Sequence, residues 1–166
     1  ACGGEAPADA GGKTPQFVGP PPVTIDEQAT YTATIATSCG TFEAELRADI
    51  APEAVNSFVF LAERGFYDGL TFHRVEPGFV IQGGCPEGSG RGGPGYRFED
   101  EPVQGNYRQG AVAMANAGPD TNGSQFFICI DDCRNSLEPL YNLFGHVTSG
   151  IEVAQSIAVG DVMTSV

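Results

Sequence analysis

Alternating apolar and polar residues predict strands through most of the chain. Residues 30–37 and 41–46 both alternate, and the second run places Phe42, Ala44 and Leu46 on one face. A period of two is typical of half-buried strands, and the Cys-Gly pair between the two runs predicts a hairpin. Further strands are predicted at residues 79–82, 111–115, 125–130, 143–147 and 162–166.

Two short helices are predicted among these strands. Pro52 opens the first, because a missing N–H does no harm in the first turn of a helix. Apolar residues then repeat at helical spacing until Gly65, which ends the helix. The second helix is predicted at residues 151–158. Because short strands dominate, the pattern favours a mainly β fold, a closed barrel with helices covering its ends.

The first 28 residues lack this patterning. They are rich in Gly, Ala and Pro and contain the run Pro20-Pro21-Pro22, a composition typical of a linker. Such a segment buries too little apolar area to order itself unless it lies against the domain. We therefore predict a tether at residues 1–28 and one folded domain at residues 29–166, which is an ordinary domain size.

Composition narrows the set of partners. The 41% hydrophobic content suffices for one core, whereas 8 Lys and Arg against 21 Asp and Glu give a net charge of -13. An acidic surface repels phosphate backbones and anionic headgroups, so we expect no nucleic-acid partner. No apolar run is long enough to span a bilayer, so membrane contact is expected only through a covalent lipid.

The five cysteines suggest different uses. Ala1-Cys2-Gly3-Gly4 is typical of the end of a bacterial lipoprotein signal, which predicts a signal peptide before Cys2, a lipid on Cys2 and an extracytoplasmic, membrane-anchored protein. The alternative is a cysteine in a disordered tail. The other four allow three disulfide connectivities, and a zinc site is disfavoured because no C-x-x-C pair is present. These four are Cys39, Cys85, Cys129 and Cys133.

The residues that could carry out catalysis or binding are concentrated in two segments. They are residues 72–84, with Arg74, Phe79 and Gln82, and residues 114–128, with Asn116, Gln125 and Phe127. Together the two segments resemble the cyclophilins, a family of peptidyl-prolyl cis-trans isomerases, and the resemblance extends from about residue 30 onward. It implies a closed, eight-stranded antiparallel β-barrel capped by two α-helices.

Rotation about an X–Pro bond needs neither a cofactor nor a metal. The barrier of ~18–20 kcal/mol comes from amide resonance, and no bond breaks when the amide twists. A catalyst can donate a cationic N–H to the nitrogen that regains its lone pair. It can also offer a dry pocket to the pyrrolidine ring and hold the backbone with hydrogen bonds.

Arg74 fits the cationic role, because a guanidinium stays charged and presents a rigid fork of donors. It matches the catalytic arginine of the family, and the alternative is a surface arginine in a weak ion pair. The amides of Gln82, Asn116 and Gln125 suit the backbone, since each both donates and accepts. For Asn116 a turn role is equally consistent with the Ala-Gly-Pro that follows it.

The resemblance also implies an apolar pocket for proline. Its members are Phe79, Val80, Phe127, Leu137 and Tyr141, with the small Ala115 and Ala117 letting a peptide approach. The alternative for each large residue is an ordinary core position. Alternation puts Gln125 and Phe127 on one face and Phe126 on the other. Arg91 is expected at the mouth of a secondary pocket.

The chain departs from the common family pattern at several positions. Val80 stands where methionine is usual, Tyr141 where many members have histidine, and Cys85 where aspartate is frequent. Ser136 stands where animal members have tryptophan. The missing indole predicts that cyclosporin binds weakly.

Two other motifs are set aside. Residues 88–93 match G-x-G-x-x-G, but Pro94-Gly95 follows where a dinucleotide site needs a helix. His73 and His146 lack ligand spacing, so no metal site is expected.

We predict a monomeric isomerase that acts on proline-containing peptides and unfolded extracytoplasmic proteins. One rival is a non-catalytic proline-peptide adaptor or holdase, which could dispense with Arg74. Another is a redox sensor that uses Cys129 and Cys133.

Overall fold

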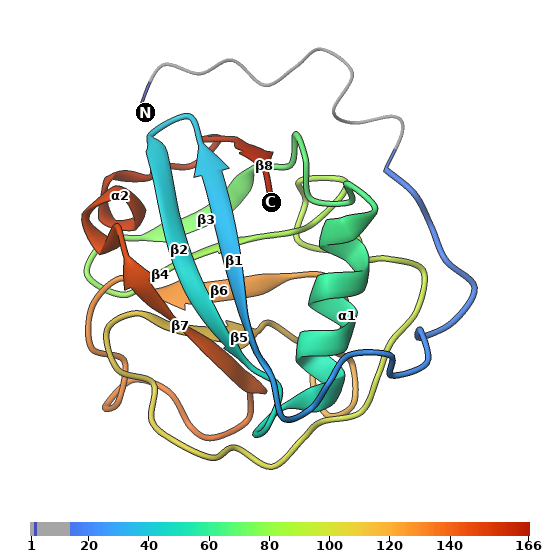
Figure 1. The fold of residues 1–166 in the computed structure, drawn as a ribbon. Helices are drawn as coiled ribbons and strands as arrows, with labels where there is room; N and C mark the ends of the chain where they lie inside the picture. The colour runs from blue at the N-terminus through green and yellow to red at the C-terminus, as the bar shows by residue number, and fades with distance from the viewer. Residues whose placement is uncertain (1, 3–13) are drawn as a thin grey trace.

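The computed structural model describes Cys2 and residues 14–166. Within these residues the fold has eight strands and two helices (Figure 1). The strands are β1 Thr30–Thr37, β2 Gly40–Arg47, β3 Phe72–Glu76, β4 Val80–Gly83, β5 Ala111–Met114, β6 Phe126–Cys129, β7 Leu143–Ser149 and β8 Met163–Ser165. The helices are α1 Pro52–Glu63 and α2 Ile151–Ser156. None of the described helices is long and apolar enough to cross a membrane.

The strands form one antiparallel sheet that nearly closes on itself. Their order is β3-β4-β6-β5-β7-β2-β1-β8, so β3 and β8 are the edges. An isolated bridge between Thr71 and Val162 joins the two edges, and the Phe72 N–H donates to the Asp161 carbonyl at 2.9 Å. The structure thus confirms the predicted mainly β, eight-stranded barrel with two helices.

β3 is the strand that the hydrophobic pattern did not separate from β4. Phe72 is its one buried residue, while Arg74 and Glu76 are exposed. An edge strand with one buried position gives a weak periodic signal, because little of it faces the core. The other strands and α1 lie within a few residues of their predicted bounds, and α2 ends two residues before the predicted 158.

The N-terminus of α1 is capped from a distant loop. Ala51 supplies no side-chain cap, and the Glu101 carboxylate accepts hydrogen bonds from the N–H groups of Glu53 and Ala54 at 3.0 and 2.9 Å. A carboxylate suits this place, because the first N–H groups of a helix lack partners. Burial nevertheless outweighs these hydrogen bonds and raises the pKa of Glu101.

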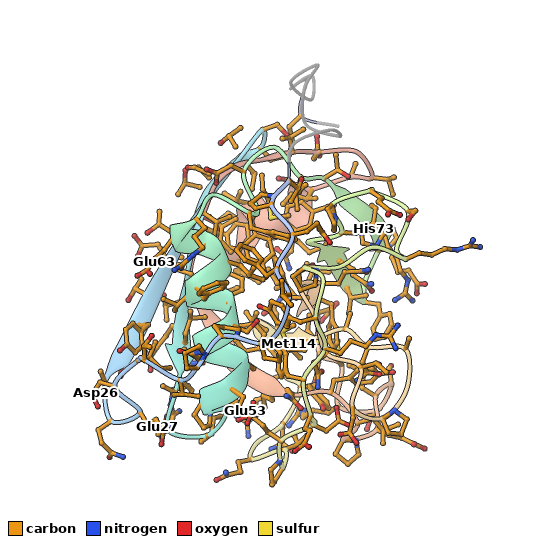
Figure 2. All side chains as sticks on the ribbon, turned by 90° about the vertical axis from the view of Figure 1, so that its right-hand side faces the viewer. Asp26, Glu27, Glu53, Glu63, His73 and Met114 are labelled. Carbon is orange, nitrogen blue, oxygen red and sulfur yellow. A yellow bond between two sulfur atoms is a disulfide. The ribbon has the colours of Figure 1, made fainter. Side chains whose placement is uncertain are left out.

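β4, β5 and β6 separate two apolar clusters. Ile81, Met114 and Phe126 face the barrel interior, and Figure 2 shows Met114 among the packed side chains there. Val80 and Phe127 belong to a second cluster on the opposite face. Because successive residues of a strand point to opposite faces, one set of strands supplies both clusters. We call the second one the outer face.

The described half of the predicted tether lies against the domain. The Phe17 ring meets the Phe60 ring of α1 edge-on at 4.9 Å between centroids. Farther along, Asn56 accepts from the Thr24 N–H at 3.0 Å and donates to the Pro22 carbonyl at 3.2 Å. Figure 1 shows this segment in blue, passing α1 before it reaches β1.

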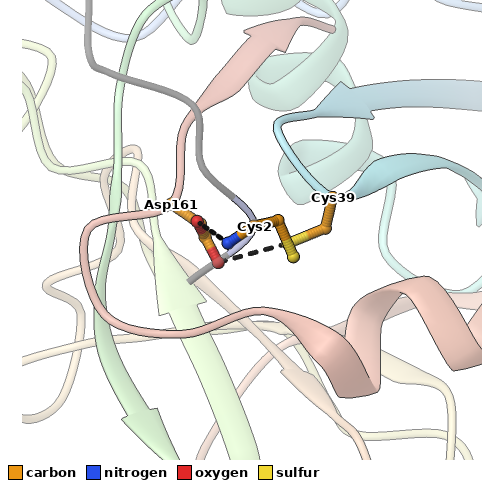
Figure 3. Close-up of side chains that lie close together, drawn as sticks. All are labelled: Cys2, Cys39 and Asp161. Carbon is orange, nitrogen blue, oxygen red and sulfur yellow. Dashed lines mark hydrogen bonds between the residues drawn. A yellow bond between two sulfur atoms is a disulfide. The ribbon is translucent and has the colours of Figure 1, made fainter.

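Cys2 is bonded to Cys39, in the turn between β1 and β2, beside the buried Asp161 (Figure 3). Burial would raise the pKa of Asp161. Hydrogen bonds from the Ala158 and Cys2 N–H groups and from Ser38 outweigh that effect and lower the pKa. One sulfur cannot carry both a disulfide and a lipid thioether. The predicted lipid on Cys2 and this bridge are therefore alternatives.

Candidate active site

Arg74 is held at the rim of the outer face by two neighbours. It pairs with Gln82 across β3 and β4, and its Nη1 donates to Gln82 Oε1 at 3.3 Å. Its Nη2 donates to Glu76 Oε1 at 2.7 Å. The Arg74 side chain remains 47% exposed, so a peptide can still reach it.

The amides continue this chain of contacts. Gln82 Nε2 donates to Gln125 Oε1 at 3.1 Å. Gln125 Nε2 in turn donates to the carbonyls of Gly90 and Gly92, at 2.9 and 2.8 Å. The network thus links Arg74 to the loop that follows β4. Because each amide is already oriented by a neighbour, little side-chain entropy remains to be lost when a peptide binds.

Asn116 has a local partner set. Its Nδ2 donates to the Leu140 carbonyl at 3.0 Å, and its Oδ1 accepts from the Gly118 N–H at 3.2 Å. The second contact is the turn role that the sequence left open. Asn116 also lines the same cavity as Gln82 and Gln125, so we treat these three as one set, the clamp amides.

The residues expected to form the proline pocket lie together. Val80 and Phe127 are buried in the outer-face cluster, and Phe79, Leu137 and Tyr141 pack against it with Ala115. Phe127 and Tyr141 meet edge-on at 5.4 Å between ring centroids. Phe127 shares the face of Gln125 as alternation predicts, yet it is only 4% exposed because these neighbours cover it.

Tyr107 fixes the backbone of Tyr141 through two hydrogen bonds. Its hydroxyl donates to the Tyr141 carbonyl at 2.6 Å and accepts from the Tyr141 N–H at 3.2 Å. Burial raises the pKa of Tyr107, so its hydroxyl keeps the donated proton. The backbone that carries Tyr141 is therefore held by a buried, neutral side chain.

Cys129 and Cys133 form a disulfide beneath this pocket, and both residues are fully buried. Cys129 belongs to β6, while the Cys133 carbonyl accepts from the Leu137 N–H at 3.1 Å. The bridge thus joins the strand that carries Phe127 to the loop that carries Leu137. The structure also contains a Cys2–Cys39 bridge. The three connectivities predicted from the sequence do not include it, because Cys2 was left out of the pairing.

Cys85 is the remaining cysteine, buried and free. The Gly92 N–H donates to its Sγ at 3.3 Å. Burial would raise the pKa of this thiol, but hydrogen bonds from the N–H groups of Gly92, Gly90, Glu87 and Ser89 lower it. Cys85 therefore organises the loop that Gln125 also holds, from the position where many family members have aspartate.

A cavity of about 840 Å³ lies beside the pocket. The clamp amides, Ala115 and Ala117 line it, and Arg91 stands in its wall, where the secondary pocket was expected. His73 lies next to Arg74. Burial and the Arg74 charge lower the pKa of His73, so it is neutral near pH 7.

Sequence reasoning missed three contributors to this site. Glu76 shares the face of Arg74 two residues away, and this spacing could have indicated the ion pair. Tyr107 and Gln16 gave no signal, because long-range folding alone brings Tyr107 under Tyr141 and Gln16 into the cavity wall.

A family profile described as "Cyclophilin type peptidyl-prolyl cis-trans isomerase/CLD" matches residues 32–165. Peptidyl-prolyl cis-trans isomerase B of Bacillus subtilis is 53% identical over 127 residues, which cover 75% of this chain and 87% of the relative. A peptidyl-prolyl cis-trans isomerase of Helicobacter pylori is 48% identical over 138 residues, covering 81% of this chain and 84% of the relative.

Solved structures agree with these sequence matches. A cyclophilin-type isomerase of Cryptosporidium parvum superposes with a TM-score of 0.75 at 30% identity, over 82% of this chain and 96% of that one. A second crystal structure of that isomerase, in the presence of the dipeptide Ala-Pro, gives a TM-score of 0.74 at 32% identity, over 81% and 96% of the two chains.

Proposed function

Because the chain belongs to the cyclophilin-type peptidyl-prolyl cis-trans isomerases, we propose that its outer face rotates X–Pro bonds through Arg74, the proline pocket and the clamp amides. The activity itself follows from the family and from relatives about half identical. The assignment of each residue to a step is our proposal. The observation that carries it is the unbroken line of contacts from Arg74 through Gln82 to Gln125, beside the apolar cluster.

In this proposal Arg74 stabilises the twisted amide. As the C–N bond rotates, the proline nitrogen becomes pyramidal and recovers a lone pair, which accepts an N–H from the guanidinium. The planar ground state offers no such acceptor, so the interaction favours the transition state selectively. Glu76 and Gln82 orient the fork in advance, which avoids reorganisation during rotation.

The pocket and the amides fix the two sides of the rotating bond. The pyrrolidine ring packs on Phe127 between Phe79 and Leu137, where little water remains. The clamp amides hydrogen-bond the backbone that precedes the proline. With one side held, rotation moves only the other, and part of the entropy cost is met by binding.

Proline-containing peptides and unfolded proteins are the proposed partners. The related structure with Ala-Pro supports a dipeptide-sized proline site in this fold. We expect the enzyme to act as a monomer without a cofactor. Cyclosporin should bind weakly, because the exposed Ser136 offers no aromatic ring at this rim.

We further propose that the protein works outside the cytoplasm. Both fates of Cys2 fit that location, since a lipid anchor follows export and a disulfide persists in oxidising compartments. The denatured protein, prepared without reductant, should contain one reactive thiol if Cys2 pairs with Cys39. A lipid on Cys2 should instead leave Cys39 reactive and keep the protein on membranes until Cys2→Ala releases it. Full-length protein found only in the cytoplasm would overturn the location.

A protease-coupled prolyl peptide assay tests the mechanism. The wild type should accelerate exchange in the presence of a chelator. Arg74→Ala should lose about 10²–10³-fold, the usual effect of removing one donor to developing charge. Arg47→Ala is the matched control, because Arg47 also pairs with a carboxylate two residues away at 2.7 Å, with a 39% exposed side chain. Equal activity of the two variants, or wild-type activity lost with the chelator, would sink the proposal.

A further inference from the structure

The N-terminal segment reaches the wall of the cavity beside the proline pocket. Gln16 lines that cavity together with the clamp amides, although it lies 66 or more residues before them in the chain. Its Nε2 donates to the Gly93 carbonyl at 2.9 Å. The next residue, Phe17, donates its N–H to the Pro94 carbonyl at 2.8 Å. Two consecutive residues therefore bind two consecutive carbonyls of the loop.

The contact is close along the backbone. Gly95 has a φ of 96°, and a Cβ there would clash with the Phe17 carbonyl oxygen. A larger residue at this position would push the segment away. On its other side the Phe17 ring packs against Phe60 of α1. The segment is thus held between the loop and the helix, while the Gln16 side chain stays exposed at the cavity.

The charged residues in the cavity lining make the side chain at position 16 relevant to peptide selectivity. Arg91 and Arg97 line the cavity with one acidic residue, Glu87. The cavity is therefore locally cationic in a chain of net charge -13. A side chain that enters it from a bound peptide meets a field that one added charge at Gln16 would change.

We propose that Gln16 is a specificity-determining residue, which contacts the peptide side chain that precedes the X–Pro bond and enters this cavity. The segment once expected to be only a tether would then form part of the substrate site. The proposal rests on the proposed function, because it places the peptide along the clamp amides. A neutral amide at this position adds no negative charge to a lining with two arginines and one glutamate, so acidic side chains are favoured.

A charge scan at Gln16 tests this directly. Three peptides that carry Glu, Ala or Lys two residues before the proline are compared for wild type, Gln16→Glu and Gln16→Lys. Gln28→Glu and Gln28→Lys are the matched controls, because Gln28 is exposed in the same segment and does not line the cavity. Each control changes the net charge by the same amount, so a difference between the sites is local.

Gln16→Glu should lower the Glu-to-Ala activity ratio by about 1.4- to 5-fold at low salt, and Gln16→Lys should raise it to a similar extent. The Lys-to-Ala ratio should move in the opposite direction. The Gln28 variants should leave both ratios within error of wild type. Equal effects at the two sites would overturn the inference while the enzyme remained active, whereas an inactive wild type would overturn the proposed function instead.

A second arm tests the docking. Phe17→Ala removes the ring that packs on Phe60, so the segment should leave the loop more often. In this background the Gln16 charge scan should lose at least half of its effect on the ratios. An undiminished effect would mean that the packing of Phe17 does not place Gln16 at the peptide.

Discussion

The two faces of β4, β5 and β6 have the same backbone but different tasks. The inner face belongs to the main core, where Ile81, Met114 and Phe126 are almost fully buried and Tyr67, from the loop after α1, packs on Phe126. The outer face starts from Val80 and Phe127 but is completed by loops, which bring Leu137 and Tyr141. In our proposal the outer face binds the substrate, whereas the inner face forms part of the larger apolar cluster.

This difference teaches where change is tolerated. The inner face is closed, so a removed side chain leaves a cavity among rigid neighbours. The outer face borders an open cavity and long polar side chains such as Arg74 and Gln82. We therefore expect substitutions there to change the binding geometry before they change stability. The connection between the faces is the strand alternation itself, since Phe126 and Phe127 are adjacent.

Truncating these two adjacent rings should have the largest effect. Phe126→Ala should lower the free energy of unfolding by about 3–5 kcal/mol, because the ring is wholly buried in the main core. The loss for Phe127→Ala should be at least about 1 kcal/mol smaller, since solvent can enter the vacated space from the cavity beside the proline pocket. Per folded molecule, Phe127→Ala should lose more isomerase activity than Phe126→Ala. Urea unfolding followed by an isomerase assay checks both, and Phe127→Ala as the more destabilised protein would break the comparison.

Adding a ring to the outer face should have an intermediate effect. Ser136→Trp supplies an aromatic surface and an indole N–H at the rim of the proline pocket, so cyclosporin should bind about 2- to 10-fold more tightly. The urea midpoint should stay at the wild-type value, because Ser136 is exposed. Titration calorimetry measures the affinity. Unchanged affinity would show that residue 136 does not border the inhibitor site.

The smallest effect concerns the pH dependence of stability that arises from Glu101, which caps α1. Burial raises the pKa of Glu101, so the folded state holds this proton more tightly than the unfolded chain does. This carboxyl therefore makes stability fall as pH rises from the unfolded value towards the raised one. Glu101→Gln should lack that component of the slope and keep wild-type activity. Parallel stability–pH curves for the two proteins would refute the prediction.

The sequence predicted the parts of the molecule that depend on local pattern. Alternation located β1, β2 and the buried strands, and two motifs located Arg74 and the clamp amides. It did not separate β3, because an edge strand with one buried residue has little periodicity. Nor could it place Gln16 or pair Cys2 with Cys39, since both depend on distant segments meeting in three dimensions.

The claim that the outer face catalyses rotation, and does not only hold proline peptides, is tested most directly by NMR exchange spectroscopy. The measurement follows cis–trans exchange of one X–Pro peptide with wild type and with Arg74→Ala, at matched occupancy. We predict similar dissociation constants for both proteins, rapid exchange with wild type, and exchange close to that of the free peptide with Arg74→Ala. Binding by both proteins without faster exchange in either would identify a holdase, and equally fast exchange in both would remove Arg74 from the mechanism.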